Sequence, residues 1–210
     1  MGDAIERATV ATITASSSDA EVIEASLRVP ERFGELYDRY AAMLYGYACQ
    51  RVGTTAAEDL VADTFLDAFS QRQRYDLARA DARPWLYGIL ANKISRRGRT
   101  EKIHYRAIAR AWQAPTVEGL AERVADQVSA QAQRGVLAAA LCRLSKADRN
   151  VLLLVAWGQL SYVEVAQALD LPLGTVRSRL HRARRTVRAA LAEAGLAGAA
   201  PESQARERTS

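Results

Sequence analysis

The sequence has few of the residues that build metal sites, disulfide frameworks or nucleophilic active sites. Its 210 residues include two cysteines, Cys49 and Cys142, and two histidines, His104 and His181. None of the four has a partner at metal-site spacing, and the cysteines stand among apolar residues, as buried thiols in a reducing cytoplasm do. No glycine-rich phosphate loop and no nucleophile–base pair stands out. The sequence predicts no metal, no cofactor and no enzymatic activity.

Long apolar runs are also missing. No stretch approaches the roughly 20 apolar residues that cross a bilayer. The N-terminal residues are acidic and polar, unlike the basic start and apolar centre of a secretory signal. Hydrophobic residues nevertheless make up 49% of the chain, which is enough for a globular core. We expect a cytoplasmic protein.

Apolar residues recur with helical periodicity, and no strand-like alternation of any length occurs. Leu36, Tyr40 and Leu44, for example, repeat every four residues, as on one face of an α-helix. Thr55 and Glu58 predict a capping box that opens a second helix. We therefore predict an all-α fold of two small helical domains joined by a flexible linker, the C-terminal one containing a helix-turn-helix.

The predicted organisation has five parts. Residues 1–29 form an acidic, disordered extension, residues 30–106 a first helical domain, residues 107–133 the linker, residues 134–194 the second domain and residues 195–210 a polar tail.

The strongest functional pattern is the predicted helix-turn-helix between residues 161 and 188. Ser161 and Glu164 form a capping box before a short helix. A turn containing Gly174 follows, and a long helix begins at Thr175. Residues 175–188 hold six arginines and no acid, so they repel one another unless phosphates oppose them. A solvated basic face is the alternative, but such faces normally interleave acids, so DNA binding is favoured.

A second basic segment follows an aromatic pair. Trp85 and Tyr87 precede Lys93, Arg96 and Arg97. Aromatic rings beside cations suit single-stranded nucleic acid, because bases stack on the rings while cations meet the backbone. Packing in the domain core is an equal alternative for Trp85.

A third pattern is acidic. Asp59, Asp63 and Asp67 recur every four residues beside Glu58, with no base between residues 57 and 70. The helix N-terminus favours the first of these charges but not Asp63 or Asp67. Such a stripe suggests a basic protein partner, and an ordinary solvent-exposed face is the alternative.

Three segments together resemble the bacterial extracytoplasmic-function (ECF) sigma factors of the sigma-70 family. They are residues 57–69, 84–92 and 173–184, and the similarity covers about residues 30–192. It implies a promoter-specificity factor that binds core RNA polymerase, directs it to promoter DNA and assists promoter melting. Ala62 departs from the family pattern, which commonly has a polar residue there.

The resemblance also implies a role for each pattern. The acidic helix would bind the β′ clamp of the polymerase through Glu58, Asp59, Asp63 and Asp67, and the second domain would contact the β flap. The minus-ten element would be bound as a melted single strand by Trp85, Asn92, Lys93, Arg96 and Arg97, with the loop 71–82. The bases of the minus-thirty-five element would be read by Arg177, Ser178, His181 and Arg182. Its phosphates would be held by Thr175, Arg179, Arg184 and Arg185.

Two further possibilities accompany this interpretation. The resemblance implies an anti-sigma protein as a partner, which would hold the protein at the inner face of the membrane if the partner is anchored there. The alternative function is an autonomous helix-turn-helix regulator whose N-terminal domain binds a ligand or dimerises. Two charged faces, rather than an apolar pocket, favour the sigma-factor interpretation.

Overall fold

The computed structural model describes residues 17–113 and 124–196, and it places side chains at 17–111 and 132–196. These residues form α-helices and two short 3₁₀ helices, with no β-strand among them. No helix in this part of the chain is long and apolar enough to cross a membrane. In chain order the elements are α2 (Asp19–Ser26), η1 (Pro30–Phe33), α3 (Gly34–Val52), α4 (Thr54–Gln71), η2 (Arg72–Arg74), α5 (Arg83–Arg96), α6 (Gly98–Gln113), α7 (Val124–Arg143), α8 (Lys146–Ala156), α9 (Tyr162–Leu169) and α10 (Leu173–Glu193).

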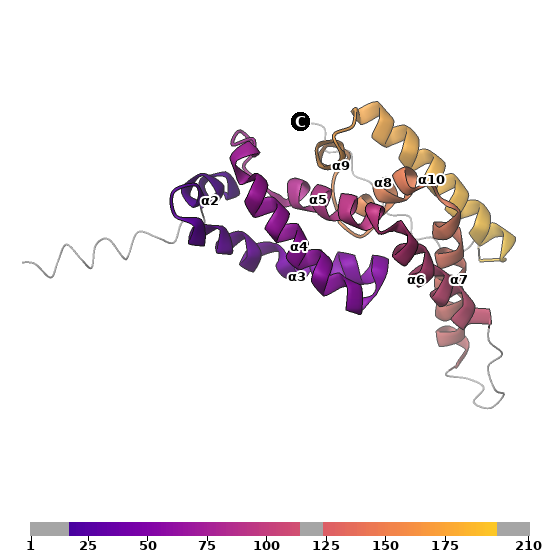
Figure 1. The fold of residues 1–210 in the computed structure, drawn as a ribbon. Coiled ribbons are helices and arrows are strands. Elements are labelled where there is room, and N and C mark those ends of the chain that lie inside the picture. The colour runs from indigo at the N-terminus through magenta and orange to yellow at the C-terminus, as the bar shows by residue number, and fades with distance from the viewer. Residues whose placement is uncertain (1–16, 114–123, 197–210) are drawn as a thin grey trace, which may run out of the picture.

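The helices form two groups that meet along α5 (Figure 1). Helices α2 to α5 make the first group, and α8 to α10 make the second. Helices α6 and α7 lie side by side as a hairpin that leads from one group to the other. The predicted all-α, two-domain fold is confirmed, and the two domains pack against each other, chiefly α5 against α9.

The core of the first domain comes from the apolar faces that the periodicity predicted. Leu36 and Leu44 of α3, Leu60 of α4, and Leu86 and Leu90 of α5 are each at most 1% exposed. Gly53 separates α3 from α4 with a φ of 84°, a left-handed conformation that glycine adopts without strain. Helix α5 therefore has one face committed to this core, and its other faces are available for contacts outside it.

The prediction of a disordered N-terminal extension is wrong for residues 19–26, which form α2. Ser18 caps this helix through a capping box with Glu21, and Val22 and Ile23 are fully buried. Asp19 is also buried, and its carboxylate accepts hydrogen bonds from Arg39 (2.7 Å) and from the backbone N–H of Ala82 (2.8 Å). These partners lie 20 and 63 residues away in the chain. The acidic composition of the segment predicted disorder because it gives no sign of such distant contacts. Residues 1–16 lie outside the described residues.

The predicted linker differs from the structure at both ends. Helix α6 continues to Gln113 and α7 begins at Val124, so the segment 107–133 is partly helical. Helices α6 and α7 contact each other, and tertiary packing of this kind stabilises helices whose own sequence signals are weak. Residues 114–123 lie outside the described part of the chain, as does the tail from residue 197.

The predicted capping box at Thr55 and Glu58 is also wrong. Helix α4 begins at Thr54, immediately after Gly53, and no side chain caps it. The compact turn at Gly53 places the N-cap two residues earlier than predicted, so the Thr55 backbone is already helical and its hydroxyl cannot act as a cap.

Removing the Asp19 carboxylate should destabilise the protein. In Asp19→Ala the Arg39 guanidinium and the Ala82 N–H lose a buried acceptor, so we expect the free energy of unfolding to fall by about 2 kcal/mol. Chemical denaturation followed by circular dichroism measures it. The control is Asp38→Ala, an exposed carboxylate on α3, which should stay within about 0.5 kcal/mol. Equal stability of the two variants would contradict a structural role for α2.

Candidate nucleic-acid interface

Helices α9 and α10 form the predicted helix-turn-helix. The capping box at the start of α9 is confirmed, since Ser161 Oγ accepts from the Glu164 N–H (3.2 Å) and Glu164 accepts from the Ser161 N–H (2.7 Å). Asp170 ends α9 in the left-handed conformation, with a φ of 51°. Helix α10 begins at Leu173, two residues before the predicted start, because Pro172 takes the N-cap position and Gly174 is already helical.

Helix α10 has an apolar side that fixes its orientation. Val176, Leu180 and Ala183 are at most 2% exposed and pack against α7, α8 and α9. They repeat at spacings of four and three, so one face of the helix is buried. The basic residues that alternate with them must therefore lie on the remaining surface.

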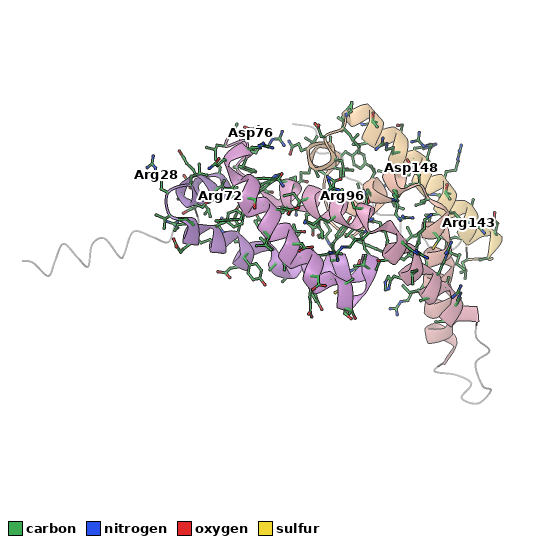
Figure 2. The ribbon with its side chains drawn as sticks, in the orientation of Figure 1. Arg28, Arg72, Asp76, Arg96, Arg143 and Asp148 are labelled. Carbon is green, nitrogen blue, oxygen red and sulfur yellow. The ribbon has the colours of Figure 1, made fainter. Side chains whose placement is uncertain are left out.

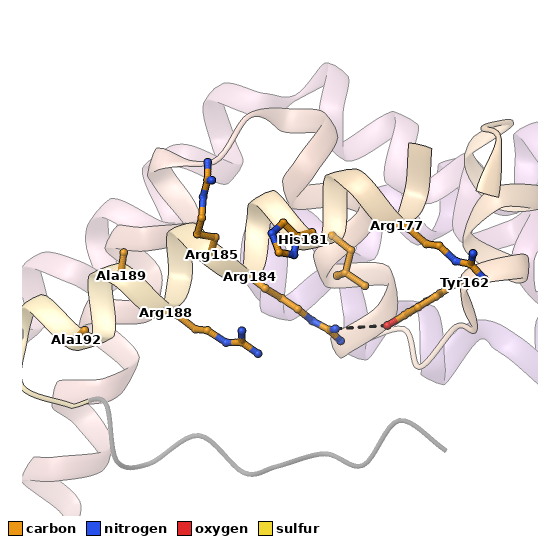
Figure 3. Close-up of a pocket in the computed structure, with 9 residues that line it drawn as sticks. Tyr162, Arg177, His181, Arg184, Arg185, Arg188, Ala189 and Ala192 are labelled. Carbon is orange, nitrogen blue, oxygen red and sulfur yellow. Dashed lines mark hydrogen bonds between the residues drawn. The ribbon is translucent and has the colours of Figure 1, made fainter. Parts of the chain in front are cut away.

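The exposed side of α10 lines a hollow of about 620 Å³ (Figure 3). Arg184 reaches across it and donates a hydrogen bond to the Tyr162 hydroxyl of α9 (3.4 Å). None of the lining side chains is acidic, so the hollow presents positive charge alone to an anion. Its lining residues are Tyr162, Arg177, Leu180, His181, Arg184, Arg185, Arg188, Ala189 and Ala192.

The structure does not bring all eight predicted minus-thirty-five residues to this hollow. Arg177, His181, Arg184 and Arg185 line it. Arg182 instead pairs with Asp148 of α8 (3.0 Å), and Asp148 and Arg143 both lie beside α10 (Figure 2).

The remaining predicted residues of α10 are also placed elsewhere. Ser178 bonds to its own helix through the Thr175 carbonyl oxygen (3.0 Å). Arg179 is half-buried and lines a separate cavity on the side of α10 that faces α5.

Two polar residues that line the hollow, Arg188 and Tyr162, were absent from the predicted set. Arg188 lies four residues after Arg184 and shares its face, so helical spacing alone identifies it. Tyr162 belongs to α9, and only the packing of the two helices brings its hydroxyl to Arg184.

Helix α5 presents the predicted minus-ten residues on more than one side. Asn92, Arg96 and Arg97 are exposed, whereas Lys93 is half-buried. Trp85 is half-buried, and its ring packs against Tyr75 at a centroid distance of 4.9 Å. The packing alternative thus accounts for part of the Trp85 surface, and the side chain is not fully buried.

The acidic stripe of α4 lies beside the basic residues of α5. Asp63 pairs with Arg97 (3.1 Å) and Asp67 pairs with Lys93 (2.6 Å). Both carboxylates are 42% exposed, so these ion pairs are screened by water and contribute little to stability. Glu58 and Asp59 are exposed as well. The carboxylates of the stripe can therefore form ion pairs with a basic partner protein.

An apolar residue on the same face of α4 was missed. Leu66 is 65% exposed and lies three residues after Asp63. Leu66 lies at helical spacing from the acidic residues. Nothing in the sequence distinguished it from a leucine that packs in the core, so its exposure was not predicted. The α4 surface thus combines carboxylates with an exposed apolar side chain, as protein interfaces commonly do.

The cysteines are free and half-buried rather than fully buried. Cys142 lies on α7, where burial raises the pKa of its thiol. A raised pKa disfavours the reactive thiolate. Across the described ranges, no three His, Cys, Asp or Glu side chains are grouped so as to hold a metal ion.

Comparison with protein families matches both domains. A sigma-70 region 2 model covers residues 36–103, and a sigma-70 region 4 model covers residues 134–187. The first match runs from α3 into the start of α6, and the second runs from α7 through α9 into α10. Both helical groups with charged surfaces therefore carry a sigma-70 region.

Curated relatives agree with these matches. The ECF RNA polymerase sigma factor SigL of Mycobacterium tuberculosis is 33% identical over 162 residues, which is 77% of this chain and 89% of SigL. SigK of Mycobacterium bovis is 28% identical over 157 residues, covering 74% of this chain and 83% of SigK. The chain belongs to the ECF RNA polymerase sigma factors, which are transcription initiation factors, and the autonomous-regulator alternative falls.

Two solved structures share the fold. CnrH, in complex with the cytosolic domain of CnrY, superimposes with a TM-score of 0.54 at 24% identity and covers 83% of this chain and 94% of CnrH. The sigma factor RpoE of Bartonella quintana, in complex with the anti-sigma factor NepR, superimposes with a TM-score of 0.52 at 24% identity. The match covers 77% of this chain and 98% of RpoE. The likeness extends over both domains.

The capping box of α9 should contribute measurably to the free energy of unfolding. Hydrogen bonds from Ser161 and Arg83 lower the pKa of Glu164, although its burial alone would raise it. Ser161→Ala removes the cap, so we expect the free energy of unfolding to fall by about 1 kcal/mol. Urea denaturation checks this. Thr186→Ala, inside α10, is the control and should change the value by less than about 0.5 kcal/mol. An unchanged free energy of unfolding in Ser161→Ala would show that the cap is dispensable.

Proposed function

We propose that this sigma factor binds core RNA polymerase through the exposed face of α4. The face carries Glu58, Asp59, Asp63 and Asp67 with Leu66 among them, and the two carboxylates that pair with α5 are each 42% exposed. Exposed pairs exchange partners at small cost, so basic side chains of the β′ clamp can replace Arg97 and Lys93. The released cations of α5 then become available for DNA.

Helix α5 binds the melted minus-ten strand. Asn92, Arg96 and Arg97 are exposed on it, and Lys93 becomes free when Asp67 turns to the clamp. Cations meet the phosphates, while the half-buried Trp85 and the loop before α5 offer stacking and hydrogen bonds to bases. Binding single-stranded DNA in this way favours the open duplex and so assists promoter melting.

Helix α10 reads the minus-thirty-five element. The observation that carries this proposal is the acid-free hollow along α10, inside the region 4 match. Arg177 and His181, in the N-terminal half of α10, contact base edges, as residues of other recognition helices do. Arg184, Arg185 and Arg188 follow toward the C-terminal end and hold phosphates. Arg182 can join them only by leaving Asp148.

The same proposal includes control by an anti-sigma protein and a cytoplasmic location. CnrH and RpoE, which share this fold, were each solved with a second protein, and the partner of RpoE is an anti-sigma factor. Exposed apolar side chains on α6 and on α9, Ile103 (57%) and Val163 (55%), offer contact area to such a partner. The second domain would contact the β flap of the polymerase.

Charge reversal on α4 tests the polymerase contact. In Asp63→Arg a cation replaces the carboxylate that faces the basic clamp, and like charges at an interface cost several kcal/mol. We expect affinity for purified core RNA polymerase to fall at least about tenfold, measured by fluorescence anisotropy without DNA. Glu24→Arg on α2 is the matched control and should bind as the unmodified protein does. Unchanged affinity of Asp63→Arg would remove α4 from the polymerase contact.

Truncation of Arg177 tests base readout. If its guanidinium hydrogen-bonds a base, Arg177→Ala should cost about 1–3 kcal/mol at one promoter position and little at others. Transcription from a set of single-base minus-thirty-five variants measures this, with Arg188→Ala as the comparison that should weaken all promoters alike. A uniform loss for Arg177→Ala would make it a phosphate contact.

A further inference from the structure

Another pocket lies where the hairpin of α6 and α7 meets the end of α3 and the end of α8. We call it the hairpin pocket. Its volume is about 370 Å³. Small-molecule sites in proteins have volumes of roughly 300–1,000 Å³, so a compact ligand fits. None of its lining residues belongs to the sets proposed above for polymerase or DNA, and the pocket is therefore unassigned.

The walls of the hairpin pocket are largely apolar. Ile108 of α6, Leu137 and Leu141 of α7, and Trp157 directly after α8 line it. Ile108, Leu137 and Trp157 are half-buried, so each keeps apolar surface that the protein itself leaves uncovered. Moving such surface out of water and against an apolar ligand is favourable. The walls thus favour a ligand with an apolar body.

The polar lining of the pocket carries positive charge and no negative charge. Arg134 of α7 is exposed and lines the pocket, and none of the other lining side chains is acidic. Burial lowers the pKa of His104, so this imidazole is neutral at pH 7 and Arg134 supplies the permanent charge. The ion pairs of α6 and α7 involve Glu101 and Arg143, and no carboxylate in the described ranges pairs with Arg134. An anionic group would therefore find an unpaired guanidinium here.

Tyr105 adds an unmet hydrogen-bond donor to the same lining. Its side chain is 1% exposed, and its hydroxyl has no partner among the described residues. Burial raises the pKa of this phenol, so the hydroxyl stays protonated and can donate. Glu101, one helical turn earlier, is shared by two buried guanidiniums, so the interior beside Tyr105 has a net positive charge. A buried donor without an acceptor is costly, which favours a ligand that brings acceptor oxygens.

We propose that the hairpin pocket binds a small amphipathic carboxylate, with its apolar chain against Ile108, Leu141 and Trp157 and its carboxylate at Arg134. A carboxylate brings the acceptors and the negative charge that the lining lacks, and its hydrogen bonds to a guanidinium are charge-assisted. A cationic ligand would be repelled by Arg134, and a neutral one would leave Arg134 unpaired. The bound ligand contacts α3, α6, α7 and Trp157 together, so it stabilises their packing.

Calorimetric titration of the full-length protein with sodium octanoate tests this site. We expect one bound octanoate with a Kd below about 1 mM, which is reasonable for a ligand of this size. Octylamine has the same apolar chain with the opposite charge, so it should bind at least about tenfold more weakly. At a free octanoate concentration ten times the Kd, the Tm should rise by about 3 °C or more.

Two variants locate the bound octanoate. Arg134→Gln removes the cation, so the affinity for octanoate should fall about tenfold. Its matched control is Arg143→Gln, an exposed arginine on the same helix outside the pocket, which should bind octanoate as the unmodified protein does. Ala138 is 3% exposed and lines the pocket, so Ala138→Leu should fill part of the space and weaken binding at least about tenfold, with unchanged helicity by circular dichroism.

Three outcomes would overturn the proposal. Failure of the unmodified protein to bind octanoate at several times about 1 mM would show that the pocket takes no such ligand. Equal affinities for octanoate and octylamine would refute the preference for a carboxylate. Unchanged affinity in both Arg134→Gln and Ala138→Leu would place octanoate elsewhere, such as on the basic surface of α10. None of these measurements uses polymerase or DNA, so they are independent of the proposed function.

Discussion

The arrangement of the two domains depends on one buried carboxylate. Glu101 accepts hydrogen bonds from Arg51 and Arg149, which approach it from the first and second domains respectively. All three side chains are withdrawn from water, so each charge needs its partners, and removing one leaves an uncompensated charge in the interior. Because these partners lie 50 and 48 residues from Glu101 in the chain, the cluster exists only when the domains are together.

The exposed ion pairs contribute less to stability than the buried Glu101 cluster does. In three ion pairs at least one member is more than two-fifths exposed. The pairs are Asp63 with Arg97, Asp67 with Lys93, and Arg182 with Asp148. Such pairs are weak in water and are readily replaced. The surfaces proposed to meet polymerase and DNA are therefore neutralised in part by the protein itself, and partners of higher charge density can displace these contacts.

Local signals predicted local structure well. The helical periodicity from Leu36 to Leu44 and the Ser161 capping box depend on residues three or four apart, and each is present in the structure. Two of the failures have different causes, one tertiary and one local. Asp19 lies in an acidic segment that reads as disordered, yet Arg39 and Ala82 give its carboxylate partners. Thr55 has capping-box spacing, but the turn at Gly53 starts the helix earlier.

Membership of the sigma factor family, the two helical domains and the charged character of α4, α5 and α10 could all be predicted from the sequence, because motif spacing and residue type express them directly. The tertiary structure decided which basic residues share a surface: Arg188 and Tyr162 join Arg184, whereas Arg179 and Arg182 are directed elsewhere. It also decided that α9 covers one face of α5. Periodicity shows that a helix has a polar face, but what covers that face depends on packing between residues far apart in the chain.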